Sequence, residues 1–336
     1  MDTRKKNFII AGTLVFIALV VLIALPSKKQ EGDTSEEKIT EIILDYANWS
    51  PISLVLKNQG FLEEELKKNN ISVRWVFSQG SNKSMELLRS KSIDIGSSAG
   101  VAALVSFVNG NPIETVYVSS TPEWTALVIP SDSKITDIKE LKGKTIAATP
   151  GTDPYVFLVH TLSEAGLSLE DVKVVTLQHP DGKNELIRHR VDAWAGLDPL
   201  MAQVEYNRQA KFLYRNVYFN SYNVISVRKE FGKKHSELVT RVLAVYEKAR
   251  QWAIDHPDEY LELIAKETKL EKPIAGLMLQ RTGLGDNQLT EKQRENISKA
   301  GKALQEANLL DVNKSIDNAI SELFNTTYFD KYLNNN

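Results

Sequence analysis

The stretch VDAWAGLDP at residues 191–199 reads as a short apolar strand with one aspartate, followed by Asp198-Pro199, where a helix can begin. A similar stretch, SIDIGS, occupies residues 92–97. Each closes a series of strand, helix, strand and helix, which predicts two α/β units of similar plan with largely parallel sheets. We expect Asp94 and Asp192, at matching places, each to lie at a strand end and bond nearby backbone, rather than to form a carboxylate pair.

The first unit extends outward from residues 92–97. Ser50-Pro51 is a strong helix start, because Ser can accept a free N–H at the N-cap and Pro at the first helical position has none to satisfy. The alternation of β-rich runs with helical stretches predicts strands at 38–46, 71–77, 93–96 and 114–119, and helices at 51–58, at 84–89 and after 97–100.

The second unit repeats this pattern, and a helical tail follows it. We expect strands at 126–130, 145–149, 172–177, 191–196, 211–214 and 222–227, and helices at 138–144, 151–166, 182–190 and after 198–199. The tail has amphipathic stretches at 236–255, 257–268 and 290–307. Such a tail packs most economically on the first unit, which predicts one lobe from residues 39–122 and 225–333 and an inserted lobe from residues 123–224.

Composition excludes several classes of function. The 336 residues are 42% hydrophobic and 25% charged with a net charge of −2, and no basic block points to a nucleic-acid partner. The absence of Cys excludes disulfides, thiolate metal sites, Cys nucleophiles and a lipid-modified Cys. The five His residues lack metal-ligand spacing, and no phosphate loop, dinucleotide fingerprint or nucleophile elbow is present. We therefore expect no metal and no cofactor.

The first 26 residues resemble an export segment. Arg4, Lys5 and Lys6 precede an unbroken apolar run at residues 8–25, and Pro26 follows it. Such a run is long enough to span a bilayer, and the bulky residues before Pro26 make a poor cleavage site. We expect an uncleaved anchor at 1–26 and a flexible tether at 27–38, which would place the remainder outside the cytoplasmic membrane.

Four predicted strand-to-helix junctions carry small or polar residues: Trp49-Ser50-Pro51, Gly96-Ser97-Ser98, Pro150-Gly151-Thr152-Asp153-Pro154 and Leu197-Asp198-Pro199. Helix N-termini at the carboxyl ends of strands can bind an anion without Lys or Arg. Plain helix capping explains any single junction equally well, so the anion hypothesis requires several of them to converge on one cleft. The tryptophans at 49, 124 and 194 could line that cleft or belong to the core.

These motifs, in this order and spacing, resemble the solute-binding proteins of ABC importers for aliphatic sulfonates, taurine and nitrate. The resemblance runs from about residue 38 to 333 and rests on Asp45-Tyr46 with Ser50-Pro51, on residues 92–97 and 138–144, on Pro150-Gly151-Thr152, and most specifically on residues 191–195 with Asp198-Pro199. It implies a two-lobed type II periplasmic-binding-protein fold, in which each lobe is a mainly parallel sheet flanked by helices. It also implies a monomer that closes on a small anionic solute between its lobes and then docks on membrane permease subunits.

Carried over by position, the resemblance implies a set of ligand-binding residues at the strand ends, the first crossing and the helix starts. They are Asn48, Trp49, Ser50, Ser97, Ser98, Thr121, Trp124, Gly151, Thr152, Asp153, Trp194 and Asp198. We expect the hydroxyls and helix-start N–H groups at residues 50, 97, 98 and 152 to hold the anion, with no Arg or Lys.

Two residues depart from the family pattern. Asp153 stands where sulfonate binders usually have a small hydroxyl or Gly, so it either points outward as a cap or meets a cationic group on the solute. Leu197 replaces a bulky aromatic. Two other functions stay open: a membrane-tethered ligand-sensing domain, and an enzyme like the pyrimidine-forming proteins of thiamine synthesis, which share the fold but depend on a Cys-rich segment.

Overall fold

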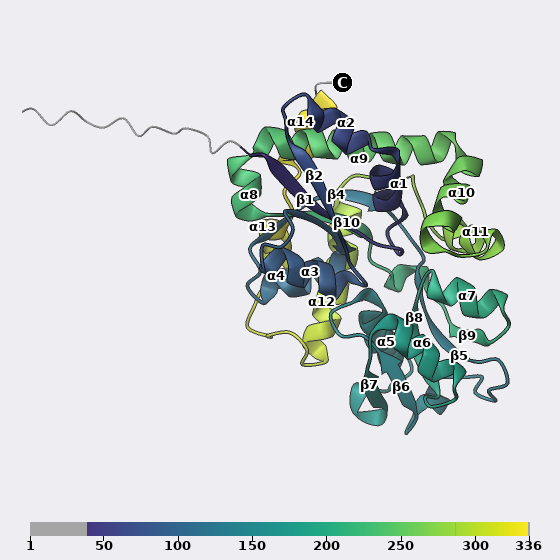
Figure 1. Ribbon diagram of the computed structural model, residues 1–336. Coiled ribbons are helices and arrows are strands. Elements are labelled where there is room, and N and C mark those ends of the chain that lie inside the picture. The colour runs from purple at the N-terminus through teal and green to yellow at the C-terminus, as the bar shows by residue number, and fades with distance from the viewer. Residues whose placement is uncertain (1–38, 286, 335–336) are drawn as a thin grey trace, which may run out of the picture. The chain divides into compact units, whose positions relative to one another are not determined.

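The computed structural model describes residues 39–285 and 287–334, and this part of the chain contains two five-stranded sheets (Figure 1). The predicted anchor and tether at 1–38 lie outside the described residues. Within the described residues, no helix is both long enough and apolar enough to cross a membrane.

The first sheet has the strand order β2-β1-β3-β10-β4. Four strands share one direction, and β10 runs between β3 and β4 antiparallel to both. The prediction of mainly parallel sheets is therefore confirmed, although each sheet contains one antiparallel strand. The strands are β1 (Glu41–Tyr46), β2 (Ser72–Phe77), β3 (Ile95–Ala99), β4 (Ile113–Ser120) and β10 (Asn223–Arg228).

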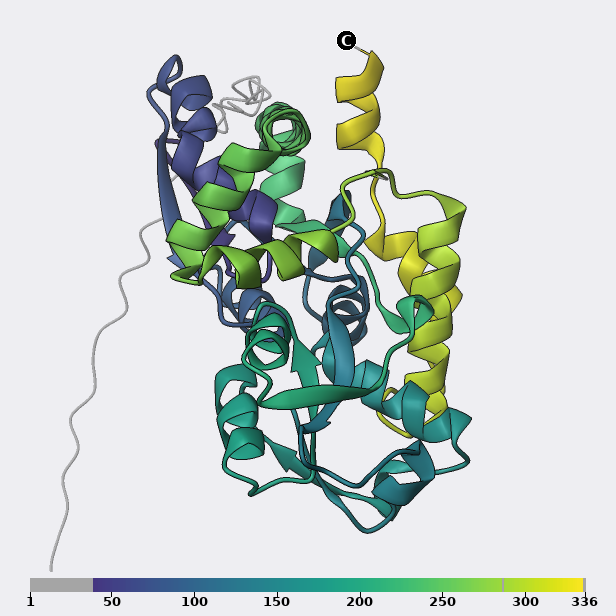
Figure 2. The same cartoon turned by 90° about the vertical axis from the view of Figure 1, so that its right-hand side faces the viewer.

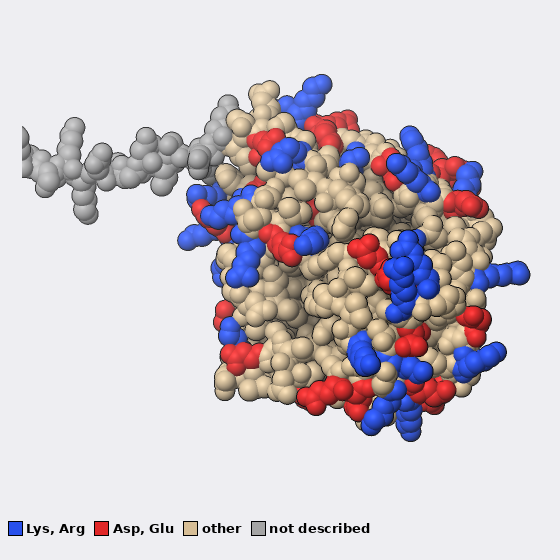
Figure 3. Space-filling model, turned by 60° about the horizontal axis from the view of Figure 1, so that its bottom comes forward, with Lys and Arg blue, Asp and Glu red and all other residues tan. Residues whose placement is uncertain are grey.

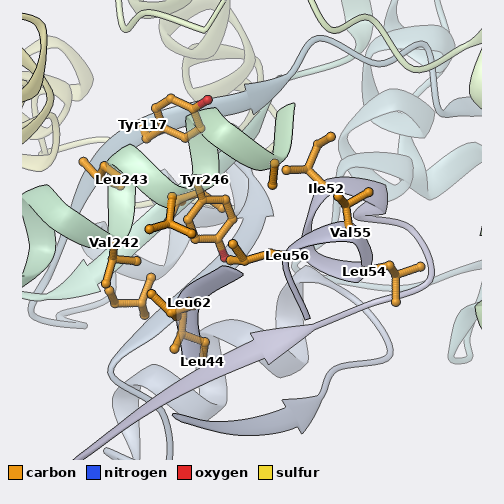
Figure 4. Packing of buried hydrophobic residues seen from close by; sticks show 14 of the residues in the cluster. Leu44, Ile52, Leu54, Val55, Leu56, Leu62, Tyr117, Val242, Leu243 and Tyr246 are labelled. Carbon is orange, nitrogen blue, oxygen red and sulfur yellow. The ribbon is translucent and has the colours of Figure 1, made fainter. Parts of the chain in front are cut away.

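Helices cover both faces of the first sheet. One core packs Leu44 and Tyr117 of the sheet against Tyr246 and neighbouring helices, as Figure 4 shows, and a second core lies on the opposite face. The helices are α1 (Pro51–Gln59), α2 (Phe61–Lys67), α3 (Ser81–Arg89), α4 (Gly100–Val108), α8 (Lys229–Lys234), α9 (Ser236–Asp255), α10 (Pro257–Thr268), α11 (Lys272–Gln280), α12 (Glu291–Glu306), α13 (Ile316–Leu323) and α14 (Thr327–Asn334).

The second sheet has the order β7-β6-β8-β5-β9, with β5 reversed against its neighbours β8 and β9. Its strands are β5 (Thr125–Pro130), β6 (Thr145–Ala148), β7 (Lys173–Thr176), β8 (Ala193–Leu197) and β9 (Ala210–Tyr214). Its helices are α5 (Asp153–Glu164), α6 (His179–Ile187) and α7 (Leu200–Tyr206), with short 3-10 turns at Ile138–Leu141, Leu169–Asp171 and Val217–Phe219.

The two sheets are joined by two crossings, one after β4 and one before β10. Figure 2 shows α12 reaching from beside the first sheet down to the second, and α12 also contacts α5. The predicted lobe limits at 122–123 and 224–225 stay predictions. On the face drawn in Figure 3, Lys and Arg alternate with Asp and Glu around a largely uncharged centre.

Several predicted element bounds were wrong, and two of them bear on the site. Ser97 and Ser98 belong to β3 and do not start a helix, because β3 continues to Ala99 in register with β10 and α4 begins at Gly100. The helix expected at 182–190 begins at His179, where Pro180 occupies the first turn.

The repeated aspartates behave as expected. Asp94 Oδ2 accepts a hydrogen bond from the Ile43 N–H at 2.9 Å, and Asp192 Oδ2 accepts one from the Thr145 N–H at 2.8 Å. The Asp94 carboxylate thus ties the start of β3 to β1, and the Asp192 carboxylate ties the start of β8 to β6. The internal repeat in the sequence therefore corresponds to a repeat in structure.

Candidate functional site

A cavity of about 120 Å³ lies between the two sheets. The first sheet contributes the residues after β1 and β2, and the second contributes the start of α6 and the junction of β8 with α7. Pockets for drug-sized ligands are roughly 300–1,000 Å³, so this cavity suits a smaller solute. Its lining residues are Asn48, Trp49, Phe77, Ser78, Gln79, His179, Pro180, Leu197, Asp198, Pro199 and Leu200.

An apolar cluster forms one side of this region and includes residues from both sheets. Trp49 and Trp124 meet edge to face, with ring centroids 5.6 Å apart, and both rings are buried. Leu197 from the end of β8 completes the contact with Ala47, Ala99 and Ala102. Leu197 therefore lines the site, and its side chain fills less space there than the bulky aromatic of the family pattern would.

Two polar atoms at the cavity are buried without a partner. The indole N–H of Trp49 and Nε2 of His179 have no hydrogen-bond partner among the described residues, although their side chains are 5% and 2% exposed. A buried polar group left unpaired costs about 1–3 kcal/mol, so a solute that supplies the missing partner recovers that free energy. Because one comes from each sheet, they point to a ligand that bridges the two.

The hydroxyl of Ser97 is already used within the first sheet. Asp45 at the end of β1 is fully buried, and its Oδ1 accepts from the N–H of Ser97 at 2.8 Å and from its hydroxyl at 3.0 Å. Its Oδ2 accepts from Ser78 Oγ at 2.8 Å. Burial raises the pKa of Asp45, and the hydrogen bonds from Ser97 and Ser78 oppose that rise. Ser97 and Ser78 are thus fixed by a carboxylate next to the cavity.

Of the three other hydroxyls expected to hold an anion, two have hydrogen-bond partners within the protein and one has none. Ser50 Oγ accepts from Asn223 Nδ2 at 2.9 Å, and Thr152 Oγ1 donates to the Thr149 carbonyl at 2.6 Å. Neither side chain caps its helix. Only Ser98 Oγ has no partner within the described part of the chain. The expected set of four free hydroxyls is therefore not present, because three of them are satisfied by protein groups.

Asp153 points inward, which excludes the outward cap, one of the two alternatives left open for this residue. Its Oδ2 accepts from Trp124 Nε1 at 2.6 Å and from the Ser221 N–H at 2.8 Å, and its Oδ1 accepts from Ser221 Oγ at 2.7 Å. Trp124 lies on the first crossing and Ser221 on the second. The carboxylate at the start of α5 thus holds both crossings, and burial raises its pKa to about 6.

Asp198 forms an ion pair with a basic residue that the sequence did not single out. Arg281, at the end of α11, lies 3.3 Å from both Asp198 oxygens and also contacts Glu205 of α7. Asp198 Oδ1 further accepts from the Ala202 N–H at 2.9 Å. Burial raises the pKa of Asp198 to about 6, against the opposing effect of Arg281. This ion pair joins the helical tail to the second sheet.

The remaining predicted residues have varied placements. Trp194 lies in the core of the second sheet, where a Cβ on Gly182 would come within 2.8 Å of its ring. Thr121 donates its N–H to the Gly283 carbonyl at 2.7 Å on the first crossing. Gly151 has a φ of +75° and lies near Asn82 of α3, and Asn48 lines the cavity.

Sequence reasoning missed the contribution of α3 and α6. Ser78, Gln79 and Gly80 precede α3, and His179 begins α6, so each follows a strand of a parallel pair as the predicted junctions do. Pro180 in the first turn of α6 is a helix-start signal, as Pro51 is for α1, and it could have been recognised. Within the described residues, no group of three or more His, Asp or Glu side chains is placed to hold a metal.

Comparisons with known proteins agree with this architecture. The model of the family described as NMT1/THI5 like matches residues 53–260. A relative from Bacillus subtilis (strain 168), described as a candidate aliphatic sulfonates-binding protein, is 27% identical over 275 residues, which cover 81% of this chain and 82% of the relative.

Solved structures show the same fold. The periplasmic aliphatic sulphonate binding protein SsuA from Escherichia coli superposes with a TM-score of 0.73 at 20% identity, covering 84% of this chain and 91% of that chain. The desulfurization enzyme DSZB superposes with a TM-score of 0.66 at 15% identity, covering 88% of this chain and 99% of that chain. The fold therefore occurs in both binding proteins and enzymes.

Proposed function

Because the chain belongs to the NMT1/THI5-like family, we propose that it is the solute-binding protein of an ABC importer. It captures a small anionic organic solute, an aliphatic sulfonate or a taurine-like compound, between its two sheets and delivers it to permease subunits. The Bacillus relative, which matches four fifths of this chain, supports the solute class and favours binding over the enzyme alternative.

One observation carries this proposal. The cavity between the sheets is bordered by buried polar groups from both sides, Trp49 Nε1 and His179 Nε2, that have no partner within the described residues. A solute that contacts both sheets at once stabilises the closed arrangement over an open one, which is how ligand binding drives hinge closure.

The anionic end of the solute has a donor on the first-sheet side. The indole N–H of Trp49 is buried and free to donate. Hydrogen bonds to a charged acceptor are stronger than those between neutral groups, so this N–H favours the anionic end of the solute. In this proposal the Trp49 indole takes the role that the sequence assigned to serine and threonine hydroxyls.

The place of the protein in the cell follows from the same proposal. An importer's binding protein works outside the cytoplasmic membrane, and the apolar run at 8–25 would hold it there as an uncleaved anchor. Tethering raises the local concentration near the permease. Retention of the full chain in membranes after carbonate washing supports the anchor, whereas a soluble form that begins near residues 27–31 contradicts it.

Calorimetric titration of the full-length chain tests the function. We expect ethanesulfonate or taurine to bind at a single site, and propionate, which has the same ethyl group on a carboxylate, to bind much more weakly. Product analysis after long incubation separates binding from catalysis, since a binding protein returns the solute unchanged. If no sulfonate binds at millimolar concentration, or if the solute is converted, the proposal is wrong.

A further inference from the structure

We propose that His179 selects the solute by accepting a hydrogen bond at Nε2, so that the preferred ligand is a small sulfonate that also carries an N–H or O–H donor. This inference rests on the proposed function. It assigns a hydrogen-bond donor to the end of the solute opposite its sulfonate. It uses a residue that the sequence did not single out.

The ring of His179 is held in place by the second sheet. His179 is the first residue of α6 and is 2% exposed. Its Nδ1 lies 3.3 Å from Thr149 Oγ1, at the end of β6. The opposite edge of the ring carries Nε2, which has no partner among residues 39–285 and 287–334.

The partner of Nδ1 decides which nitrogen holds the proton. The hydroxyl of Thr149 donates its only hydrogen to the Leu177 carbonyl at 2.6 Å, so towards His179 it can only accept. Nδ1 must therefore carry the hydrogen and donate it to Thr149. In a neutral imidazole the other nitrogen is then an unprotonated acceptor, so Nε2 presents a lone pair.

The ring is neutral at physiological pH. Its burial at the start of a helix disfavours a positive charge, because desolvation and the partial positive charge of the helix N-terminus both oppose protonation. Desolvation lowers the pKa of His179 to about 4. Nε2 therefore repels a sulfonate oxygen, which also carries lone pairs, and attracts a donor.

The lone pair faces the boundary between the two sheets. A Cβ built on Gly80, ahead of α3, would lie 3.4 Å from Nε2 and 3.3 Å from Cδ2 of His179. The amide oxygen of Asn82 on α3 is a second buried acceptor with no partner in the described part of the chain. Of these groups, His179 and Trp49 line the cavity, and the acceptor on one and the N–H donor on the other define a solute with both a donor and an anion.

Nitrogen NMR tests the tautomer in the ligand-free, full-length chain. With ¹⁵N-labelled histidine, and with His179→Gln to assign the signal, the shifts distinguish a protonated ring nitrogen from an unprotonated one. We expect hydrogen on Nδ1 and none on Nε2 at pH 7. Hydrogen on Nε2, or a doubly protonated ring, overturns the inference regardless of whether any sulfonate binds.

A matched series of sulfonates tests the selectivity by calorimetry. Ethanesulfonate, 2-aminoethanesulfonate and 2-hydroxyethanesulfonate share the anion and differ in the donor, and the N-trimethyl form of 2-aminoethanesulfonate keeps the positive charge without an N–H. We expect the two donor-bearing compounds to bind about tenfold more tightly than the other two. Equal affinity across the series, or preference for the trimethyl compound, overturns the inference.

Two substitutions separate hydrogen bonding from packing. His179→Phe keeps the ring bulk without the acceptor, and we expect it to bring the affinity ratio of 2-hydroxyethanesulfonate to ethanesulfonate close to one. His179→Gln retains an acceptor and should restore part of the preference. His160→Gln, on the face of α5 that stacks against Phe219, is the control and should leave the ratio unchanged. If none of the sulfonates binds, the proposed function fails and the selectivity fails with it, whereas binding without donor preference overturns the selectivity alone.

Discussion

Trp49 is the residue whose removal most simply tests the anion end of the site. Trp49→Phe deletes an unpaired indole N–H while keeping an aromatic ring against Trp124. A hydrogen bond to a charged group contributes roughly 1.5–3 kcal/mol, so we expect sulfonate affinity to fall by about tenfold or more. Trp75→Phe is the matched control, since that indole donates to Glu63 at 2.7 Å outside the cavity. Equal affinities for the two variants would contradict this role.

Asp153 gives the chain a pH dependence whose sign follows from its buried carboxylate. Its folded-state pKa of about 6 lies above the ordinary 3.8, so the folded chain binds that proton more tightly than the unfolded chain. The stability contributed by this proton is present below pH 3.8 and is lost as the pH rises to about 6. The free energy of unfolding of the wild type, relative to Asp153→Asn, should therefore fall over that interval.

Denaturant titrations at several pH values measure that difference. The subtraction removes the parallel titration of Asp198, which both proteins share. A difference that stays flat between pH 4 and 6, or that grows with pH, would show that the Asp153 carboxylate is not the buried, hydrogen-bonded group described above.

Single residues were predicted well where the same contact recurs in both α/β units, and poorly where a contact occurs only once. Asp94 and Asp192 bond strand backbone as their position at a strand end suggested. Asp153 meets Ser221, which is 68 positions away, and Arg281 meets Asp198 across 83 positions. Nothing in the spacing of one sequence reveals such contacts, because the tail must first fold back beside the second sheet.

At the scale of elements, the approach of α3 to α6 can be tested through Gly80. A Cβ there would lie 3.0 Å from Asn82 Oδ1 and 3.3 Å from the His179 ring. The backbone φ of −176° is open to any residue, so Gly80→Ala should keep the fold and hinder closure of the two helix starts. We expect weaker solute binding with little change in the thermal midpoint.

Gly276→Ala is the control for this substitution. Gly276 lies inside α11, and a Cβ there would meet only Leu261, at 4.0 Å. Because Ala is the better helix former, this change should raise the free energy of unfolding by about 0.5–1 kcal/mol and leave affinity unchanged. A Gly80→Ala chain that binds as tightly as the wild type would remove α3 and α6 from the site.

Most helices and strands were predictable because hydrophobic period and helix-start residues act locally. The helices expected at 236–255 and 257–268 have those bounds in the structure. The error at Ser97 and Ser98 has a non-local cause: β10, which pairs with them, lies more than a hundred residues later in the chain. The sequence thus predicted the order of elements better than the limits of the strand that crosses the site.

At the scale of the whole described unit, Arg281 links the helical tail to the second sheet. Removing one partner of a buried ion pair leaves the other charge uncompensated, which is strongly destabilising. We expect Arg281→Gln to leave Asp198 unpaired and to loosen the closed arrangement, so that small-angle scattering gives a larger radius of gyration without solute. Arg241→Gln, which breaks a pair with Glu65 between two helices of the first sheet, α9 and α2, should not change the radius. Identical curves for both variants would contradict this role for Arg281.

The central claim is that a small sulfonate lies between the two sheets, against Trp49 and His179. The most direct measurement is a crystal structure of the full-length chain with saturating 2-bromoethanesulfonate, in which the anomalous signal of bromine locates the ligand. We predict one bromine peak inside the cavity bounded by Asn48, Trp49, His179 and Leu197, with the sulfonate oxygens nearest the Trp49 N–H. A peak elsewhere on the chain, or an empty cavity in crystals of a chain that binds the compound in solution, would contradict the claim.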